Sequence, residues 1–461
     1  MTATDPALWT TTEQVGAIRR GDLGSVELLD AQLARVDRLN PSVNAVCTLA
    51  IDSARERALA ADEATAKGSS WGPLHGVPIT IKDAIATAGI RSTGGSPEML
   101  GNVPQRDATV VDALKRAGAI VFGKTNVPLW SGDLQTFNEM FGTTNNPWDL
   151  DRVPGGSSGG AAAAVACGMT SFEIGTDIGG SVRVPSAFCG VFGHKPSHGV
   201  IPTLGYIDEP NGGLTESDIN VFGPIARSAA DVALLLGLLA GPAPDRAAAW
   251  RLELPRAELT NLRDVRVATW FDEPSLPHDP DMSAVLDGVA DLLVAAGAFV
   301  DRSARPEIDF TEAWTAGAWL ITAATHISDG ERAVNHTDWL VADRVRAARR
   351  HRWAEFFGDF DVLLCPITLT PAFAHQQEGT WATRKIVVDG VTLPFDALEA
   401  WPALIGSAYL PSTAAPVGRT PAGLPVGVQV VSPYLHDHRS IAVAGMLTDL
   451  TGGYDVPPLA R

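Results

Sequence analysis

Three side chains of types that catalyse acyl transfer stand at defined points of the sequence. Lys82 closes a short apolar run, Ser157 lies in the run Gly-Gly-Ser-Ser-Gly-Gly (155–160), and Ser181 closes the run Gly-Thr-Asp-Ile-Gly-Gly-Ser (175–181). Glycine lets backbone N–H groups turn toward a ligand, and N–H groups beside a serine can hold a carbonyl oxygen. The same residues also fit two structural glycine turns and a lysine that reaches out to water. Residue types alone leave both interpretations open.

Lysine is scarce in this chain, and Lys82 stands where a charge is costly. Of the 35 lysines and arginines, six are lysines. A free lysine has a pKa of about 10.4, so only about one in 10³ is neutral at pH 7. The neighbouring Ile79 and Ile81 provide an apolar environment that would lower the pKa of Lys82 by desolvation. Because adjacent side chains of a strand face opposite sides, we expect Asp83 to point away from Lys82.

Two other motif matches indicate different chemistry. The run from Gly118 to Thr125 fits the phosphate-binding pattern G-x4-G-K-[ST], but a predicted strand occupies its x4 stretch and would use the same N–H groups. The run from Gly156 to Gly160 fits G-x-S-x-G, the nucleophile turn of Ser-His-Asp hydrolases. That turn should follow a strand, whereas Pro154 and two charges precede it here. We interpret both matches as coincidental and keep nucleotide binding as the alternative from another functional class.

The segments around these residues predict an α/β protein. Short apolar runs typical of buried strands alternate along the chain with segments that have helical character. The runs with strand character are 76–85, 119–122 and 423–431, and the helical segments include 110–117, 160–168 and 228–239. No repeat, linker or change of composition divides the chain. We therefore predict a single domain over residues 1–461.

Charge and cysteine content narrow the functional classes. A net charge of −18 argues against a broad surface for nucleic acid or an anionic membrane. The first residues lack the parts of a signal peptide, no apolar segment is long enough to cross a bilayer, and the four cysteines show no disulfide pattern. We therefore expect a cytoplasmic protein. The ten histidines have no metal-ligand spacing, so we expect no metal and no other cofactor.

Taken together, the motifs resemble the amidase signature family of serine hydrolases. The similarity covers residues 15–240 and 405–440 and extends well beyond the two serine loops. It includes Gly-Lys-Thr-Asn-Val-Pro (123–128), Gly-Thr-Thr-Asn-Asn-Pro-Trp-Asp (142–149), Cys-Gly-Val-Phe-Gly-His-Lys-Pro (189–196) and Pro-Ala-Gly-Leu-Pro-Val-Gly-Val-Gln (421–429). The resemblance implies a single α/β/α domain around a large mixed, twisted β-sheet.

The resemblance gives each of the three side chains a role. Ser181 is the nucleophile that attacks the carbonyl carbon. Ser157, which the family holds by a cis peptide bond, passes the proton between Ser181 and the base Lys82. The resemblance also implies an oxyanion hole, which is made by the backbone N–H groups of Ile178, Gly179, Gly180 and Ser181.

The resemblance also implies supporting roles for further residues. Ser131 stands where the backbone carbonyl receives the substrate N–H in some family members. Trp130 beside it favours an apolar or aryl substrate. Asp177 and Arg183 are expected to be structural partners of the nucleophile loop, and Ser158 is expected to form hydrogen bonds behind the catalytic residues.

The resemblance implies a hydrolase that cleaves the C–N bond of small amides, with aryl or alkyl amides as substrates and esters or carbamates (including urethanes) as further candidates. We expect residues 1–70 to form a helical N-terminal part and residues 71–240 and 405–461 the catalytic core. Residues 241–404 are expected to form a divergent region at the substrate pocket, where six tryptophans offer apolar walls: Trp314, Trp319, Trp339, Trp353, Trp381 and Trp401.

The expected partner is a small-molecule amide, ester or carbamate, with no nucleic acid and no membrane, and the expected assembly is a monomer or a homodimer. The alternative within the family is the A-type subunit of a glutamine amidotransferase, which would need partner subunits to use the ammonia that it releases.

Overall fold

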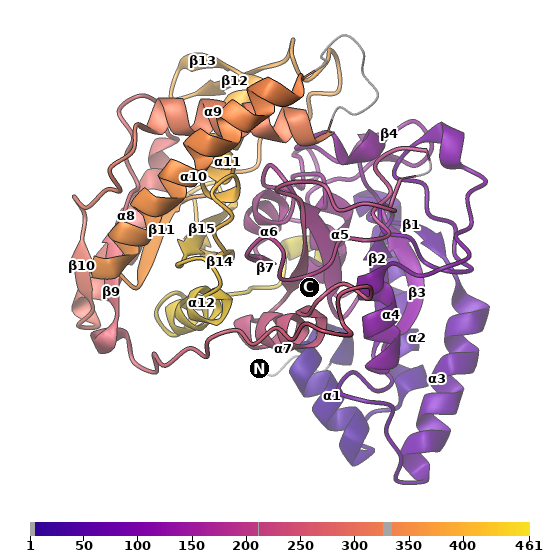
Figure 1. Ribbon diagram of the computed structural model, residues 1–461. Helices are drawn as coiled ribbons and strands as arrows, with labels where there is room; N and C mark the ends of the chain where they lie inside the picture. The colour runs from indigo at the N-terminus through magenta and orange to yellow at the C-terminus, as the bar shows by residue number, and fades with distance from the viewer. Residues whose placement is uncertain (1–4, 211, 326–333) are drawn as a thin grey trace.

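The computed structural model describes residues 5–210, 212–325 and 334–461, in which helices surround a central sheet (Figure 1). Within these ranges the α-helices are α1 (Thr11–Arg20), α2 (Ser25–Val43), α3 (Ile51–Ala66), α4 (Thr109–Arg116), α5 (Gly159–Ala166), α6 (Arg183–Cys189), α7 (Ala229–Leu239), α8 (Pro280–Ala295), α9 (Phe310–Thr325), α10 (His336–Asp359), α11 (Ala400–Gly406) and α12 (Asp437–Thr451). The predicted helices at 110–117, 160–168 and 228–239 correspond to α4, α5 and α7.

The strands of the described chain form one large sheet and three small ones. The large sheet has eight strands in the order β10-β9-β11-β15-β14-β7-β8-β6. Its strands are β6 (Glu173–Asp177), β7 (Phe192–Lys195), β8 (Val221–Ala226), β9 (Arg266–Thr269), β10 (Phe299–Asp301), β11 (Val362–Pro366), β14 (Ser412–Arg419) and β15 (Pro425–Val431). The small sheets comprise β1 (Val46–Leu49), β3 (Ile120–Thr125) and β2 (Pro78–Lys82), then β4 (Phe137–Asn138) with β5 (Gly142–Thr143), and β12 (Lys385–Val388) with β13 (Val391–Pro394).

The large sheet is mixed, which confirms the predicted fold class. Strand β9 pairs in parallel with β10 and with β11, whereas the pairs from β11 through to β6 are antiparallel. Strands β9, β10 and β11 come from residues 241–404, the region that we expected to diverge around the pocket. Because this region completes the sheet, the arrangement favours the single-domain prediction.

The strand that carries Lys82 belongs to a small sheet beside the large one. Strand β2 pairs in parallel with β3. A side chain of β6, the strand at the edge of the large sheet, links β6 to β2. The Glu173 carboxylate of β6 accepts hydrogen bonds from the backbone N–H of Lys82 at 3.0 Å and from the Thr80 hydroxyl at 2.8 Å. A carboxylate therefore replaces the strand ladder between the two sheets and sets the position of Lys82 relative to β6.

Buried helices hold the loops of the candidate site. Every residue of α5 is buried, which is typical of a helix that is apolar on all sides. Its alanines and glycines permit close packing against α6 and the strands β6 and β8. In Figure 1, α1, α2 and α3 gather at one end of the molecule, and α8, α9 and α10 lie at the other, with the buried helices between them.

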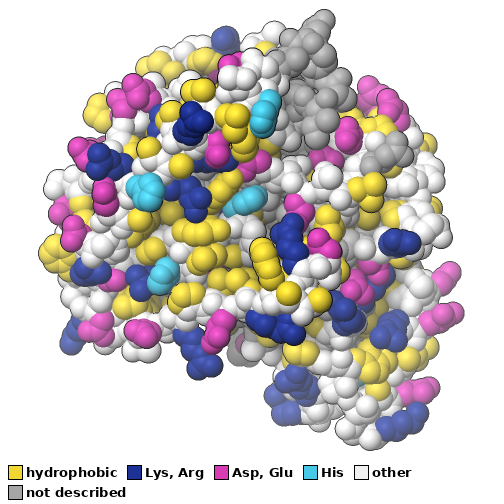
Figure 2. All heavy atoms as spheres, in the orientation of Figure 1, with side chains coloured by type: hydrophobic (Ala, Val, Ile, Leu, Met, Phe, Trp, Pro, Cys, Tyr) yellow, Lys and Arg dark blue, Asp and Glu magenta, His cyan; other side chains and the backbone are white. Residues whose placement is uncertain are grey.

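The visible surface carries charges of both signs. Figure 2 shows basic and acidic side chains interspersed over one face. None of the helices in the described ranges combines the length and the apolar character needed to cross a bilayer.

Candidate active site

Lys82 is the last residue of β2, and its side chain is completely buried. Its Nζ donates hydrogen bonds to Ser157 Oγ at 2.7 Å, to Ser158 Oγ at 3.0 Å and to Thr176 Oγ1 at 2.7 Å. An ammonium group has three N–H donors, so these hydroxyls use all of them. When the amine is neutral, it has a lone pair that can accept the proton of a hydroxyl. The arrangement suits a base that takes a proton from Ser157.

The surroundings of Lys82 favour its neutral form. Burial lowers the pKa of Lys82 to about 7, although the carboxylates of Asp177 and Glu173 act in the opposite direction. A pKa of about 7 leaves about half of the amine neutral at pH 7. Asp83 lies on the other side of the strand end, as strand alternation predicts, and accepts hydrogen bonds from the N–H and the hydroxyl of Thr93.

Two residues that position Lys82 were missed by the sequence analysis. The Thr176 hydroxyl of β6 accepts one of the three hydrogen bonds that the Lys82 amine donates. The Glu173 carboxylate of β6 accepts a hydrogen bond from the Lys82 backbone N–H. Burial raises the pKa of Glu173 to about 7, although hydrogen bonds from the Thr80 and Thr125 hydroxyls lower it. A carboxylate inside an apolar segment is the signal that would have found Glu173, by the same reasoning that singled out Lys82.

Ser157 lies in a tight loop directly before α5. The peptide bond between Gly156 and Ser157 is cis, as the family resemblance implied. The loop packs so closely on the segment before β4 that a Cβ on Gly156 would lie 2.5 Å from the Asp133 carbonyl oxygen and 2.6 Å from that of Gln135. Only glycine fits such an approach. The loop places the Ser157 hydroxyl against the Lys82 amine.

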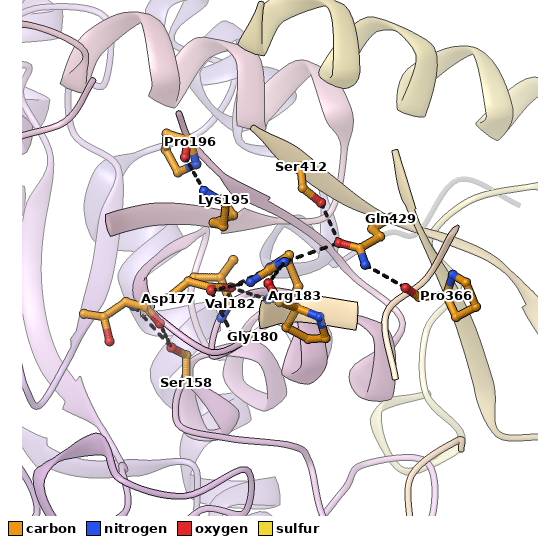
Figure 3. Close-up of polar contacts among 12 residues, drawn as sticks. Ser158, Asp177, Gly180, Val182, Arg183, Lys195, Pro196, Pro366, Ser412 and Gln429 are labelled. Atoms are coloured by element: carbon orange, nitrogen blue, oxygen red, sulfur yellow. Dashed lines mark hydrogen bonds and ion pairs between the residues drawn. The ribbon is translucent and has the colours of Figure 1, made fainter. Parts of the chain in front are cut away.

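Ser181 lies in the loop between β6 and α6, and the Asp177 side chain holds this loop in shape (Figure 3). Asp177 accepts hydrogen bonds from the N–H of Gly180 at 2.9 Å and of Val182 at 3.0 Å. The Ser181 carbonyl oxygen accepts a hydrogen bond from the Ser158 N–H at 3.2 Å. This bond ties the nucleophile loop to the segment that carries Ser157. The triad roles of Lys82, Ser157 and Ser181 stay predictions that this geometry supports.

One of the four N–H groups that the resemblance assigns to the oxyanion hole has a hydrogen-bond acceptor within the loop. The Gly180 N–H donates to Asp177 Oδ1, so it is engaged within the loop. No side-chain acceptor holds the N–H groups of Ile178, Gly179 or Ser181 in the described chain. We therefore expect these three groups to hold the carbonyl oxygen of a substrate.

Trp130 and Ser131 lie together in the short 3₁₀ helix η3 (Leu129–Ser131). Both have left-handed backbone angles, with φ of 50° and 57°. The Trp130 ring covers Gly94, where a Cβ would lie 3.1 Å from the ring atoms. The hydroxyl of Ser131 is buried and lies near the Tyr206 hydroxyl, whose pKa burial raises to about 12, although the Ser131 hydroxyl lowers that pKa. The predicted role of the Ser131 carbonyl in binding the substrate N–H stays a prediction.

Two of the six tryptophans of the divergent region pack on the same small apolar cluster as Ile178 of the nucleophile loop. Trp319 of α9 and Trp339 of α10 are partly buried and pack, together with Ile178, on a small apolar cluster made of Ile219, Leu320, Ile321 and Ala403. The other four belong to or pack against a separate core cluster, and Trp353 and Trp401 are almost completely buried there. Helices α9 and α10 therefore contribute apolar side chains to the cluster on which Ile178 packs.

The motifs that we interpreted as coincidental are structural. The run 118–125 enters β3, whose residues 120–125 pair with β2, so no phosphate cradle forms there. Lys124 is buried and donates to the Ile85 carbonyl oxygen and to the hydroxyls of Thr87 and Ser92. The serine of the G-x-S-x-G match, Ser158, follows a loop instead of a strand.

No histidine joins these serines in a Ser-His-Asp triad within the described ranges. His194, which follows the G-x-S-x-G match along the chain, is buried between Thr413 and Asp437 and bonds to both. Among the described residues, no group of three or more His, Cys, Asp or Glu side chains is arranged to hold a metal ion.

The ion pair between Asp177 and Arg183 has no access to solvent (Figure 3). Arg183 donates to both carboxylate oxygens of Asp177, and also to Pro402 O and Gln429 Oε1. Burial alone would raise the pKa of Asp177, but the Arg183 guanidinium and the hydrogen bonds hold that pKa below its usual value. These contacts agree with the predicted structural roles of both residues.

We expect Arg183→Met to lower the free energy of unfolding by about 3–5 kcal/mol, because it leaves a buried carboxylate without its partner. Urea unfolding followed by far-UV circular dichroism measures the change. The matched control is Arg20→Met, which breaks the exposed pair with Asp22 and should change the free energy of unfolding by less than about 1 kcal/mol. A loss for Arg183→Met no larger than that of the control would contradict a structural role.

Comparison with known proteins places the chain in a family. The family model described as Amidase matches residues 27–331 and 321–441. The A-type subunit of the glutamyl-tRNA(Gln) amidotransferase from Roseiflexus sp. (strain RS-1) is 34% identical over 470 residues, which cover 90% of this chain and 91% of the relative.

Two solved structures illustrate the likeness of fold. A protein of a complex described as revealing the evolutionary origins of an s-triazine catabolic enzyme has a TM-score of 0.84 and 26% identity, covering 97% of this chain and 100% of that chain. The 6-aminohexanoate cyclic dimer hydrolase has a TM-score of 0.80 and 26% identity, covering 99% of each chain. With the family match, these relatives identify the chain as an enzyme that acts on amide C–N bonds, by hydrolysis or by amido transfer. The chain belongs to the amidase signature family.

Proposed function

We propose that this protein is a serine hydrolase of broad scope that cleaves aryl and alkyl amides. The observation that carries the proposal is the completely buried Lys82 amine, whose Nζ lies 2.7 Å from Ser157 Oγ. The segment that contains Ser157 is in turn joined to the Ser181 loop by the hydrogen bond from the Ser158 N–H to the Ser181 carbonyl oxygen. The apolar cluster on which Ile178, Trp319 and Trp339 all pack supports an apolar acyl or aryl group as part of the substrate.

In the proposed mechanism Ser181 Oγ attacks the carbonyl carbon and transfers its proton through Ser157 to neutral Lys82. The negative charge on the carbonyl oxygen is held by backbone N–H groups of the nucleophile loop. The C–N bond then breaks, and the leaving nitrogen takes the proton back through Ser157, which leaves an acyl group on Ser181. Water adds to this ester by the same relay, and the acid departs with Ser181 restored.

Amides, esters and carbamates share the carbonyl that Ser181 would attack, so the triad does not choose among them. The test is a panel of p-nitroanilides, p-nitrophenyl esters and aryl carbamates, run on the wild-type protein and on Ser181→Ala. We expect the wild type to hydrolyse apolar anilides and the variant to lose that activity. A purified wild type without activity on any member of the panel would overturn the proposal. The same preparation, run on a sizing column, tests the expected monomer or homodimer.

The A-type subunit of a glutamine amidotransferase is the second candidate, because relatives with that name are about as long as this chain and 29–34% identical to it. It predicts release of ammonia from glutamine and dependence on partner subunits. Fast anilide hydrolysis by the isolated chain, without release of ammonia from glutamine, would decide against it.

The pH dependence of the reaction follows from Lys82. Burial lowers the pKa of this base to about 7, so the amine takes up a proton and stops accepting one as the pH falls below 7. We expect kcat/KM for a neutral anilide to fall by about tenfold per pH unit below that point. Initial rates between about pH 5 and pH 8 measure this acid limb. A rate that stays constant down to pH 5 would contradict Lys82 as the base.

A further inference from the structure

A carboxyl group that the proposed mechanism does not use lies against the nucleophile loop. Glu399 is the last residue of the 3₁₀ helix η6 (Phe395–Glu399), directly before α11, and it is half-buried. A Cβ added to Gly179 would lie 2.5 Å from Glu399 Oε1 and 3.1 Å from its Cδ. The carboxyl therefore rests on a residue whose N–H we expect to hold the substrate oxygen.

Helix α11 keeps Glu399 at this place. Pro402 of α11 packs on Gly180, where a Cβ would lie 2.9 Å from the proline ring, and its carbonyl oxygen accepts a hydrogen bond from Arg183 Nη1. The helix is thus joined to both sides of the Ser181 loop. Since the contact to Gly179 comes from the residue that precedes this helix, the Glu399 carboxyl has a defined position relative to the loop.

The surroundings of Glu399 disfavour its ionised form. Burial, together with the carboxylates of Asp396, Asp177 and Asp133, raises the pKa of Glu399 to about 8, although Arg183 acts in the opposite direction. Asp177 is paired with Arg183, and Asp133 is paired with Arg384, so part of their charge is compensated. Near neutral pH the carboxyl that lies on the loop is mostly uncharged.

We propose that Glu399 is a specificity-determining residue of the amide site, which permits acyl transfer from uncharged substrates while it is neutral and favours substrates with a positive charge near the carbonyl once it is ionised. The physical reason is that acyl transfer develops a negative charge on the substrate oxygen beside Gly179. A carboxylate at Gly179 repels that charge, and it attracts a cation on the acyl group. The inference rests on the proposed function, because it requires an oxyanion at this loop.

A pair of substrates with the same shape and different charge tests the proposal in the wild-type protein. The two are the p-nitroanilides of trimethylammonioacetic acid, which carries a permanent positive charge, and of 3,3-dimethylbutanoic acid, which is neutral. We expect kcat/KM for the neutral anilide to fall at least about tenfold from pH 8 to pH 10, while the value for the cationic anilide does not fall. The ratio of the two values cancels any loss that affects the enzyme as a whole.

Glu399→Gln keeps the shape of the side chain and removes its titration. We expect this variant to hydrolyse the neutral anilide at pH 10 as well as at pH 8 and to show a ratio that no longer changes with pH. Glu378→Gln, the same substitution at an exposed position, is the matched control and should retain the wild-type profile.

The outcomes separate this inference from the proposed function. If the wild type hydrolyses neither anilide nor any other member of the panel, the proposed function fails. If it hydrolyses both and their ratio is independent of pH, the inference about Glu399 alone is overturned. This measurement needs no variant, so it decides the question even if Glu399→Gln does not fold. The inference is also overturned if a folded Glu399→Gln protein shows the same change in the ratio of the two kcat/KM values between pH 8 and pH 10 as the wild type.

Discussion

Ser181→Ala is expected to lower kcat for anilide hydrolysis by about 10⁴-fold or more, because the proposed reaction has no other group to form the acyl-enzyme. Ser181 is 6% exposed, whereas Lys82 and Ser157 are completely buried. It is thus the one member of the proposed triad that a substrate reaches from solvent. The measurement is the initial rate of p-nitroaniline release at saturating substrate.

The fold should survive this substitution. The Ser181 backbone carbonyl, which accepts the Ser158 N–H, is unchanged by it. We expect the urea midpoint to shift by less than that of a typical core substitution. Ser186→Ala is the matched control: it makes the same change in α6, at a buried hydroxyl without a hydrogen-bond partner in the described chain. A Ser181→Ala protein that retains more than a tenth of the wild-type rate would rule out Ser181 as the nucleophile.

Lys82→Ala is expected to lower kcat by about 10³-fold or more, since it removes the group that accepts the proton of the nucleophile. The hydroxyls of Ser157, Ser158 and Thr176 would lose their common partner, and the relay would end at Ser157. Water can occupy part of the space that the lysine leaves, but a water molecule is a far weaker base than an amine. Single-turnover rates of acylation measure the loss in the step where it acts.

The pH profile distinguishes loss of a base from general damage. The residual activity of Lys82→Ala should lack the acid limb near pH 7, because the titrating group is gone. Lys385→Ala, at an exposed lysine of β12, should retain both the rate and the limb. A Lys82→Ala protein that keeps the acid limb would assign that limb to another group, for which Glu173 would be the first residue to test.

The local features of the site were predictable because each depends on few neighbours along the chain. A β-branched apolar run ending in Lys82 becomes a buried strand, and the glycines around Ser157 and before Ser181 permit tight loops. The same local logic placed Asp83 on the opposite side of the strand end from Lys82. The mixed α/β fold followed from the alternation of elements together with the family resemblance.

Other features depend on residues that only folding brings together. Glu173 replaces a strand ladder between two sheets, and nothing in its own neighbourhood along the chain shows which strand it would meet. The Gly180 N–H donates to the Asp177 carboxylate, because the loop curls back on a side chain three residues earlier. Of the six tryptophans in the divergent region, Trp319 of α9 and Trp339 of α10 pack on the same apolar cluster as Ile178 of the nucleophile loop.

The sequence by itself determined the chemical type of this protein, because the motifs around Lys82, Ser157 and Ser181 together carry the resemblance to a family of enzymes that act on amide C–N bonds. Only the tertiary structure decided the charge state and the neighbours of these groups. The pKa of Lys82 depends on complete burial against Asp177 and Glu173, and Glu399 comes to Gly179 from a part of the chain more than two hundred residues away. Desolvation and charge act through space, over distances that sequence separation does not measure.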